Sequence, residues 1–390
     1  MKRSLLSALA AGAVALLLTH AAGADAPPLK IGLVSTLSGN FTQAGKAGEA
    51  AFAAFFKAHG DTVAGRKVQI IKRDDGGNAP DTAKRLAQEL IVSEHVDFLM
   101  GLVFSPNAKA VGDVSTSAKK PTFITNAASN GILETNPYMA RFSYTEGQLT
   151  TPLAAWALKN NIKTVYTIVL DYATGLDAAS GFESAYTGGG GKILGQVRVP
   201  LNSQDFSPYV QRIKDARPQA IFAFLSVSAG PFLKAWDAAA MPATGTKILA
   251  TGDLTSETLL PSYGDAALGL ITSMNYAASH NSPLNKQLGR DMHAADASVD
   301  GPDFASVATY DVMSAIYKVV EAQKGNVDPD KTMQLIRGMK IDSARGPIMI
   351  DPQTRDVVQT IYIRRVEKVD GKYQNTEIAS YPNVRDPIEK

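Results

Sequence analysis

Cysteine is absent from this chain of 390 residues. The chain therefore forms no disulfide, has no thiolate nucleophile or cysteine-ligated metal, and offers no thiol for lipid attachment, which excludes a lipoprotein. Its stability must come from the size of its core. Once the leader described below is removed, about 365 residues remain. Single cores rarely grow beyond about 250 to 300 residues, so we expect two of them.

A net charge and the common catalytic motifs are also missing. The chain has 39 basic and 37 acidic residues, and the leader contains two of the basic ones, so the mature protein is formally neutral. Because no basic run is long enough to contact a phosphate backbone, we expect no nucleic-acid binding. No H-E-x-x-H, G-x-S-x-G or G-x-G-x-x-G pattern occurs. We therefore expect no metal site, no cofactor and no enzyme activity.

The first residues have the pattern of a secretory leader. Lys2 and Arg3 precede an apolar stretch over 5–18, which is too short to span a bilayer, and small residues at 22–24 form a cleavage site. We predict a signal peptide over 1–24 and a periplasmic protein that is soluble after cleavage. A membrane anchor is the alternative, but no longer apolar run follows.

Six short apolar runs each end at small or hydroxyl residues and then pass into a helix-like pattern. They begin at Ile31, Phe98, Thr122, Tyr166, Ile221 and Ile248. Strands this uniformly apolar are buried on both faces, which indicates parallel sheets covered by helices; the spacing of about 30 residues is that of one strand and one helix. Ligands bind outside the carboxyl ends of such strands, so we expect the binding site in these loops.

Two breaks in the repeat, near residues 141–148 and 276–283, predict crossings between domains. Helices are predicted over 81–93, 151–159, 284–295 and 303–322. The helix over 151–159 is expected to begin near Pro152, because proline suits a first turn. The tail alternates like antiparallel strands over 347–350, 357–366 and 373–381, and Asp370-Gly371 is a typical hairpin turn.

The loop that follows the strand at Phe98 offers an anion site. Ser105 is a good N-cap and Pro106 suits the first helical position, so the amides of Asn107 and Ala108 are expected to point into the crevice. Ala128-Ser129-Asn130 repeats the arrangement on the neighbouring strand, and Ser38-Gly39 gives a third polar loop. Together these donors predict a cradle for a carboxylate. The alternative is that each serine only caps its helix.

Aromatic residues lie in the same loops and at the second break. They are Phe41, Phe104, Tyr172 and Tyr276. Their rings predict flat apolar walls for an organic side chain, although each one alone is also a normal core residue. Asp253, at the end of another strand, either faces a ligand ammonium group or caps the helix after it.

Several stretches resemble a known family. KIGLVSTLSGNFTQAGKAGEAAF, RDDGGNAPDTAKRLAQELI, DFSPYVQRIKDARPQAIFAF and RGPIMIDPQTRDVVQTIYIRRVEKVDG are similar to the periplasmic solute-binding proteins of ABC importers, of the leucine and branched-chain amino acid type. The likeness covers essentially the whole mature chain. Asn40-Phe41 departs from the pattern, since relatives often carry proline there.

The resemblance implies a type I periplasmic binding protein, an α/β fold of two Rossmann-like lobes with mostly parallel sheets and three crossover hinges. Lobe 1 would take 29–144 and 279–345, and lobe 2 would take 145–278 and 346–390. The resemblance also assigns site residues. The ligand carboxylate would be held by Ser105, Ala128 and Ser129, Tyr172 would line the site, and Asp253 would meet a ligand ammonium group.

The implied function is capture of a branched-chain amino acid or a related apolar or aromatic carboxylate in the cleft, followed by delivery to an inner-membrane ABC permease. Related proteins of the subgroup bind aromatic carboxylates, and the rings at Phe41, Phe104 and Tyr172 suit such a ligand. We expect a monomer. The alternatives are a periplasmic sensor of an aromatic acid or amide that signals to a membrane receptor, and an enzyme on the same scaffold.

Overall fold

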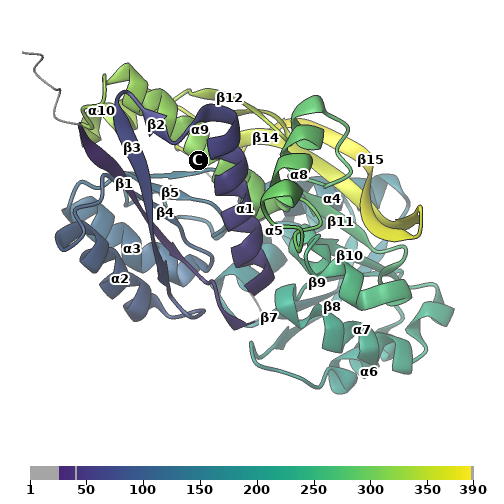
Figure 1. Cartoon of the computed structure of the whole chain (residues 1–390). Helices are drawn as coiled ribbons and strands as arrows, with labels where there is room; N and C mark the ends of the chain where they lie inside the picture. Colours follow the sequence, from purple (N-terminus) through teal and green to yellow (C-terminus); the bar gives the residue numbers. More distant parts are fainter. Residues whose placement is uncertain (1–25, 40–41, 388–390) are drawn as a thin grey trace, which may run out of the picture.

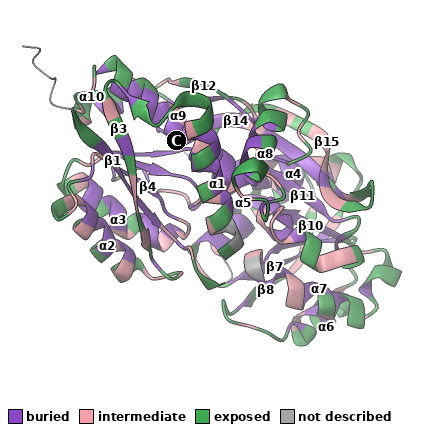
Figure 2. Cartoon of the chain, viewed as in Figure 1, coloured by how far each residue is buried: buried purple, intermediate pink, exposed green. Residues whose placement is uncertain are grey.

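The computed structural model describes residues 26–39 and 42–387, so the predicted signal peptide lies outside the described residues. The described chain forms two α/β lobes that lie beside each other, each built on its own sheet (Figure 1). Buried residues gather along the strands and the inner faces of the helices, while the outer helix faces are exposed (Figure 2). No helix within the described ranges is long and apolar enough to cross a membrane.

The first sheet is parallel except at one edge, where β2 and β3 pair antiparallel. Its strand order is β2 (Thr62–Val63), β3 (Arg66–Asp74), β1 (Ala26–Ser35), β4 (Phe98–Gly101), β5 (Thr122–Ile124) and β6 (Met139–Arg141). The residues of β4, β5 and β6 are all buried. This burial explains their continuous apolar runs, because helices cover both faces of the sheet.

The second sheet has a parallel part and an antiparallel part. Its order is β12 (Lys340–Ser343), β13 (Gly346–Ile350), β14 (Val357–Val369), β11 (Ile271–Met274), β10 (Lys247–Thr251), β9 (Ala220–Phe224), β7 (Thr164–Leu170) and β8 (Lys192–Val199), with β15 (Lys372–Val384) paired to β14. The strands from β8 to β11 run parallel, and those from β11 to β15 and β12 pair antiparallel.

Helices cover both faces of each sheet. In the first lobe, α2 (Pro80–Val92) and α3 (Ser105–Ser117) cover one face, and α1 (Thr42–His59), α8 (Pro283–Ala295), α9 (Phe304–Ala322) and α10 (Pro329–Ile336) lie on the other side. In the second lobe, α4 (Glu146–Lys159) and α5 (Ala173–Gly188) cover one face, and α6 (Ser207–Ala216) and α7 (Ala229–Ala238) cover the other. The fold is therefore the predicted α/β fold with two lobes.

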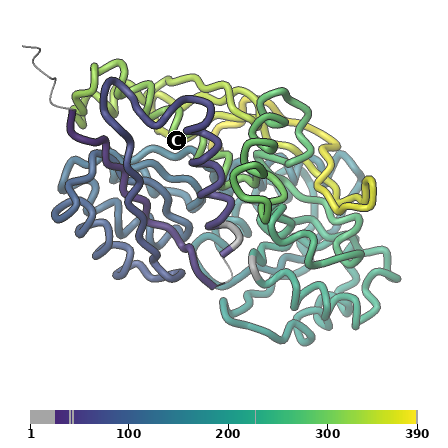
Figure 3. The backbone as a smooth tube through the Cα atoms, in the orientation of Figure 1, coloured from purple at the N-terminus to yellow at the C-terminus, as the bar shows by residue number. Residues whose placement is uncertain are grey.

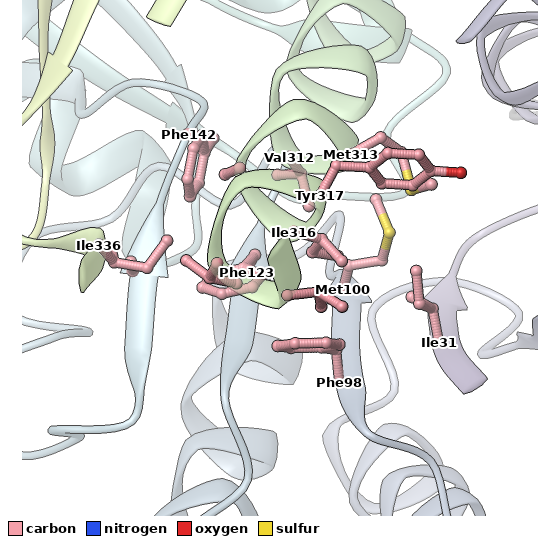
Figure 4. Packing of buried hydrophobic residues seen from close by; sticks show 14 of the residues in the cluster. Ile31, Phe98, Met100, Phe123, Phe142, Val312, Met313, Ile316, Tyr317 and Ile336 are labelled. Atoms are coloured by element: carbon pink, nitrogen blue, oxygen red, sulfur yellow. The ribbon is translucent and has the colours of Figure 1, made fainter. Parts of the chain in front are cut away.

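The chain crosses between the lobes three times. It leaves the first lobe after β6, returns after β11 and crosses again at β14, so residues near 300–350 lie against the N-terminal part (Figure 3). The aromatic and aliphatic core of the first lobe joins these distant segments: Phe98 and Phe123 of the sheet face Val312 and Ile316 of α9 (Figure 4). Since Ile348 also belongs to this core, we propose that the third crossing lies within β14.

Buried ion pairs hold the crossings together. Arg345, which is 1% exposed, pairs with Asp311 at 2.9 Å and donates to the main-chain carbonyls of Phe142 and Ser143. A single buried guanidinium therefore joins α9, the strand pair β12–β13 and the first crossing. Breaking such a pair from one side leaves an uncompensated buried charge, which is strongly destabilising.

One helix begins earlier than the sequence predicted. The helix expected over 151–159 is α4, and it starts at Glu146, with Pro152 inside it rather than in its first turn. Thr145 and Gln148 form a reciprocal capping box, which satisfies the free amides at the new start. The other predicted helices and the tail strands are present within a few residues. The Asp370-Gly371 turn is confirmed, with positive φ at both residues between β14 and β15.

We expect a side chain at Gly175 of α5 to destabilise the folded protein. A Cβ there would lie 2.1 Å from the carbonyl oxygen of Leu170, so Gly175→Ala must push α5 away from β7 and should lower the free energy of unfolding by about 1–3 kcal/mol. At Gly188, in the same helix, a Cβ would have open space within 4 Å. Gly188→Ala should change stability by less than about 1 kcal/mol. Denaturant unfolding that gives equal values for the two variants would contradict this packing.

Candidate ligand-binding site

A cavity of about 170 Å³ lies between the two lobes at the carboxyl ends of their strands. The loops after all six predicted strands contribute to its lining. The last residues of two strands also take part. The lining residues are Ser35, Thr36 and Leu37 at the end of β1, Val103, Phe104 and Ser105 after β4, Thr125, Asn126 and Ala128 after β5, Tyr172 and Thr174 after β7, Phe224 and Ser226 at the end of β9, and Asp253 after β10. The structure thus brings together, in one cavity, loops that are far apart in sequence, as expected for open α/β sheets.

The walls are aromatic and the charged groups are acidic. Rings come from both lobes: Phe52, Phe104, Tyr144, Tyr172, Phe224 and Phe304. Four carboxyl residues also line the cavity, namely Glu49, Glu146, Asp253 and Asp303, whereas no lysine or arginine is among its described lining residues. Hydroxyl and amide hydrogens are therefore the donors that the described lining offers to an anionic ligand.

Ser105 connects the two lobes. Its Oγ accepts hydrogen bonds from the amides of Ala128, at 3.2 Å, and Ser129, at 3.0 Å, and from the hydroxyl of Thr174 in the second lobe, at 3.1 Å. Three groups therefore meet at an oxygen that has two lone pairs and one hydrogen, so the Ser105 hydroxyl is fully engaged with the two amides and Thr174. Ser105 and Thr174 both line the cavity, so their paired hydroxyls are the hydrogen-bonding groups that this cluster presents to a ligand.

Further hydrogen bonds cross between the lobes beside Ser105. The hydroxyl of Ser129 donates to Oγ1 of Thr174 at 3.0 Å, and the amide of Asn130 donates to Asp177 of α5 at 3.2 Å. Ser129 does not itself line the cavity, but it bonds two residues that do. The first turn of α5 in the second lobe is therefore fixed to the β5 loop of the first lobe.

The predicted helix cap at Ser105 is wrong. Helix α3 has Phe104 at its N-cap position and begins at Ser105, and the amide of Ala108 donates to the carbonyl of Phe104 at 3.0 Å. That amide therefore does not point into the crevice. The side chain of Asn107 is turned away from the cavity as well, because it bonds Asp75 and Gly77. The amides of Ala128 and Ser129 donate to Ser105 and fix the position of its hydroxyl at the cavity.

Asp253 lines the cavity from the short 3-10 helix η4 (Gly252–Thr255). It does not cap a helix; its carboxylate accepts a hydrogen bond from the hydroxyl of Thr251. Burial raises the pKa of Asp253, and the hydrogen bonds from Thr251 and the main chain, together with the charge of Arg364, oppose that rise. Arg364 holds the loop in place by donating to the carbonyl of Gly252 at 3.0 Å.

Glu146 is a cavity residue that the sequence did not single out. It is the first residue of α4, and its amide donates to the carbonyl of Ala128 at 3.1 Å. Its side chain is 1% exposed, and Oε2 has no hydrogen-bond partner among the described residues. Burial, then the charges of Asp253 and Asp177, raise the pKa of Glu146 well above its ordinary value, which favours the neutral carboxyl.

The remaining predicted residues fall in three places. Phe104, Ala128 and Tyr172 line the cavity, and burial raises the pKa of the Tyr172 phenol, which therefore stays protonated. Tyr276 is fully buried away from the cavity, where its hydroxyl donates to Asn285 at 2.8 Å. Phe41 lies outside the described residues.

Signals for the residues that were missed are partly visible in the sequence. The run Thr145-Glu146-Gly147-Gln148 is a capping box, which places Glu146 at a helix start. Nothing local shows that this start lies against the β5 loop, because the contact joins two lobes. For a metal ion, the described ranges contain no suitable group of His, Asp or Glu side chains.

Residues 28–372 match the model of the periplasmic binding protein family. The Leu/Ile/Val-binding protein homolog 6 of Brucella abortus is 39% identical, over 99% of both chains. Two solved solute-binding proteins of ABC transporters from Rhodopseudomonas palustris are each 40% identical and cover 93% of this chain and 99% of theirs. The BisB5 protein, in complex with 3,4-dihydroxybenzoic acid, has a TM-score of 0.88, and the HaA2 protein, in complex with p-hydroxybenzoic acid, has 0.90.

Two α/β lobes with a cavity between them form the architecture that is typical of ligand-binding proteins. The match and the identities show that this chain belongs to the periplasmic binding protein family. The solved relatives serve ABC transport, which fits the predicted transport role and not the sensory alternative.

We expect Glu146 to make the folded state sensitive to pH. Because its folded pKa is raised above the ordinary 4.5, its contribution to stability is complete below that value and is lost as the pH rises through the folded pKa. As the pH rises above about 5 towards the raised folded pKa, the wild-type free energy of unfolding should fall relative to Glu146→Gln by up to about 1.4 kcal/mol per pH unit. Denaturant titrations at several pH values test this, and parallel pH profiles for the two proteins would refute it.

Proposed function

We propose that this protein captures a single-ring aromatic carboxylic acid between its lobes and delivers it, unchanged, to an ABC permease in the inner membrane. The observation that carries the proposal is the cavity itself, which has aromatic walls and, at Ser105 and Thr174, a pair of hydroxyls held by two main-chain amides. We further propose that the protein works in the periplasm as a monomer and catalyses no reaction.

The size of the cavity supports a single ring. A cavity of about 150 Å³ in another protein accommodates benzene, and the volume here is about 170 Å³. The rings of Phe104, Tyr172 and Phe224 come from both lobes, so an aromatic ligand would contact both. The two Rhodopseudomonas palustris relatives, at 40% identity, were solved with hydroxylated benzoic acids.

Ligand capture follows from contacts that exist only when the lobes meet. The hydroxyl of Ser105 belongs to the first lobe and Thr174 belongs to the second, and they bond each other beside the cavity. A ligand that contacts both lobes stabilises the closed state relative to an open one, and this shifts the equilibrium. Micromolar affinity corresponds to about 8 kcal/mol, which hydrogen bonds to a carboxylate and a buried ring can supply.

A branched-chain amino acid is the second candidate. The Brucella abortus relative carries a Leu/Ile/Val-binding name, and Asp253 in the cavity offers a partner for an ammonium group. The aromatic acid is favoured because the aromatic lining is extensive and because the solved relatives at 40% identity hold benzoic acids.

A thermal-shift panel separates the two candidates. We expect benzoate and hydroxybenzoates to raise Tm, while leucine, isoleucine and valine leave it unchanged. A ligand at a hundred times its Kd adds about 2.7 kcal/mol to the free energy of unfolding, which a melting curve resolves. The panel should include phenylpropenoates, amides and urea as other chemical classes. Stabilisation by leucine alone would overturn the aromatic assignment.

Replacing Ser105 tests the carboxylate cradle. Ser105→Ala removes the hydroxyl donor and the acceptor that holds two amides, so affinity for the aromatic acid should fall by tenfold or more. Ser117→Ala is the matched control, because Ser117 lies in the same helix, is exposed and bonds only its own helix at Asp113. Calorimetric titration measures both; unchanged affinity in Ser105→Ala would remove Ser105 from the site.

A further inference from the structure

Glu146 is the one acid of the described cavity lining that combines nearly complete burial with an unpaired side-chain oxygen. Its carboxyl lines the cavity, its residue is 1% exposed, and Oε2 accepts and donates no hydrogen bond within residues 26–39 and 42–387. Buried polar groups in folded proteins are nearly always paired, so such an oxygen needs an explanation. Its place in a binding cavity points to a group on the ligand.

The surroundings of Glu146 decide which form of the carboxyl is present. Asp253 from η4 and Asp177 from α5 face it with like charge, and the tyrosines Tyr144 and Tyr172 lie near enough to interact with it. Arg141 is the cation that acts on it, but Arg141 already pairs with Asp356 at 2.8 Å. An ionised Glu146 would be a buried charge without a partner of its own and would repel an anionic ligand. The neutral acid is therefore the form that fits.

A neutral carboxyl carries one O–H donor and acceptor oxygens. A ring hydroxyl is its complement, since it both accepts and donates. We propose that Glu146 is a specificity-determining residue that hydrogen-bonds a hydroxyl on the ring of the bound acid, so that the site prefers hydroxylated benzoates to benzoate. This inference rests on the proposed function and adds to it which aromatic acids are selected.

The expected preference follows from the cost of an unpaired polar group. When benzoate binds, Glu146 stays buried without a partner, whereas a hydroxylated ring satisfies it. A site that hydrogen-bonds a ligand hydroxyl discriminates strongly against the analogue that lacks it. We expect the wild type to bind 4-hydroxybenzoate or 3,4-dihydroxybenzoate at least tenfold more tightly than benzoate.

The test measures the affinities of benzoate, 4-hydroxybenzoate and 3,4-dihydroxybenzoate for the wild type and two variants by calorimetry. Glu146→Met keeps the volume and removes the hydrogen bond, so the preference for the hydroxylated acid should fall to within threefold while benzoate binding is retained. Glu146→Gln keeps a neutral donor and acceptor, so the preference should persist. Glu183→Gln is the matched control. Glu183 is a partly buried glutamate of α5 that bonds Thr167 and Gln196 and does not line the cavity, so its replacement should leave the preference intact.

Each outcome separates the inference from the proposed function. If no aromatic acid binds the wild type, the proposed function fails. If all three acids bind the wild type equally, or if Glu146→Met weakens all three by the same factor, the function stands and the role of Glu146 is overturned. Should Glu146→Met not fold, a crystal structure of the wild type with the tighter hydroxylated acid decides the matter. A ring hydroxyl bonded to Glu146 supports the inference, and a ring hydroxyl bonded elsewhere overturns it.

Discussion

The structure depends on the hydrogen bonds that meet at the Oγ of Ser105. Two amides of the β5 loop and the hydroxyl of Thr174 converge on this oxygen, which joins two strands of one lobe to a helix of the other. The same residue lines the cavity. Binding and closure are therefore coupled by geometry, since a group that bonds Ser105 adds to the cluster that holds the lobes together.

The second constraint is the charge of the cavity. Acidic side chains and aromatic rings line it, and no described lining residue is basic. Desolvation raises the pKa values of Glu146 and Asp253, which favours the neutral, hydrogen-bonding form of each acid. A carboxylate ligand can then enter without a cation, provided that amide and hydroxyl hydrogens meet its charge. Two buried arginines lie outside the cavity lining. Arg345 bonds the main chain of the first crossing, and Arg364 bonds the main chain of the η4 loop.

Local sequence patterns predicted the fold and the loops of the site, because each depends on a short segment. Apolar runs such as that at Phe98 marked buried parallel strands, and the rule for open sheets placed their loops together. The start of α4 was misplaced because Pro152 was given more weight than the capping box at Thr145. Glu146, Thr174 and the buried position of Tyr276 depend on contacts between distant segments, and no local pattern encodes these.

The central claim is that an aromatic acid is held by both lobes at once. Small-angle X-ray scattering of the wild type, with and without saturating 4-hydroxybenzoate, tests this most directly, because closure of two lobes reduces the radius of gyration. The account predicts a smaller radius with the ligand and a smaller change in Thr174→Val, which lacks the hydroxyl that bonds Ser105. A fully bound protein whose radius of gyration does not change would contradict it.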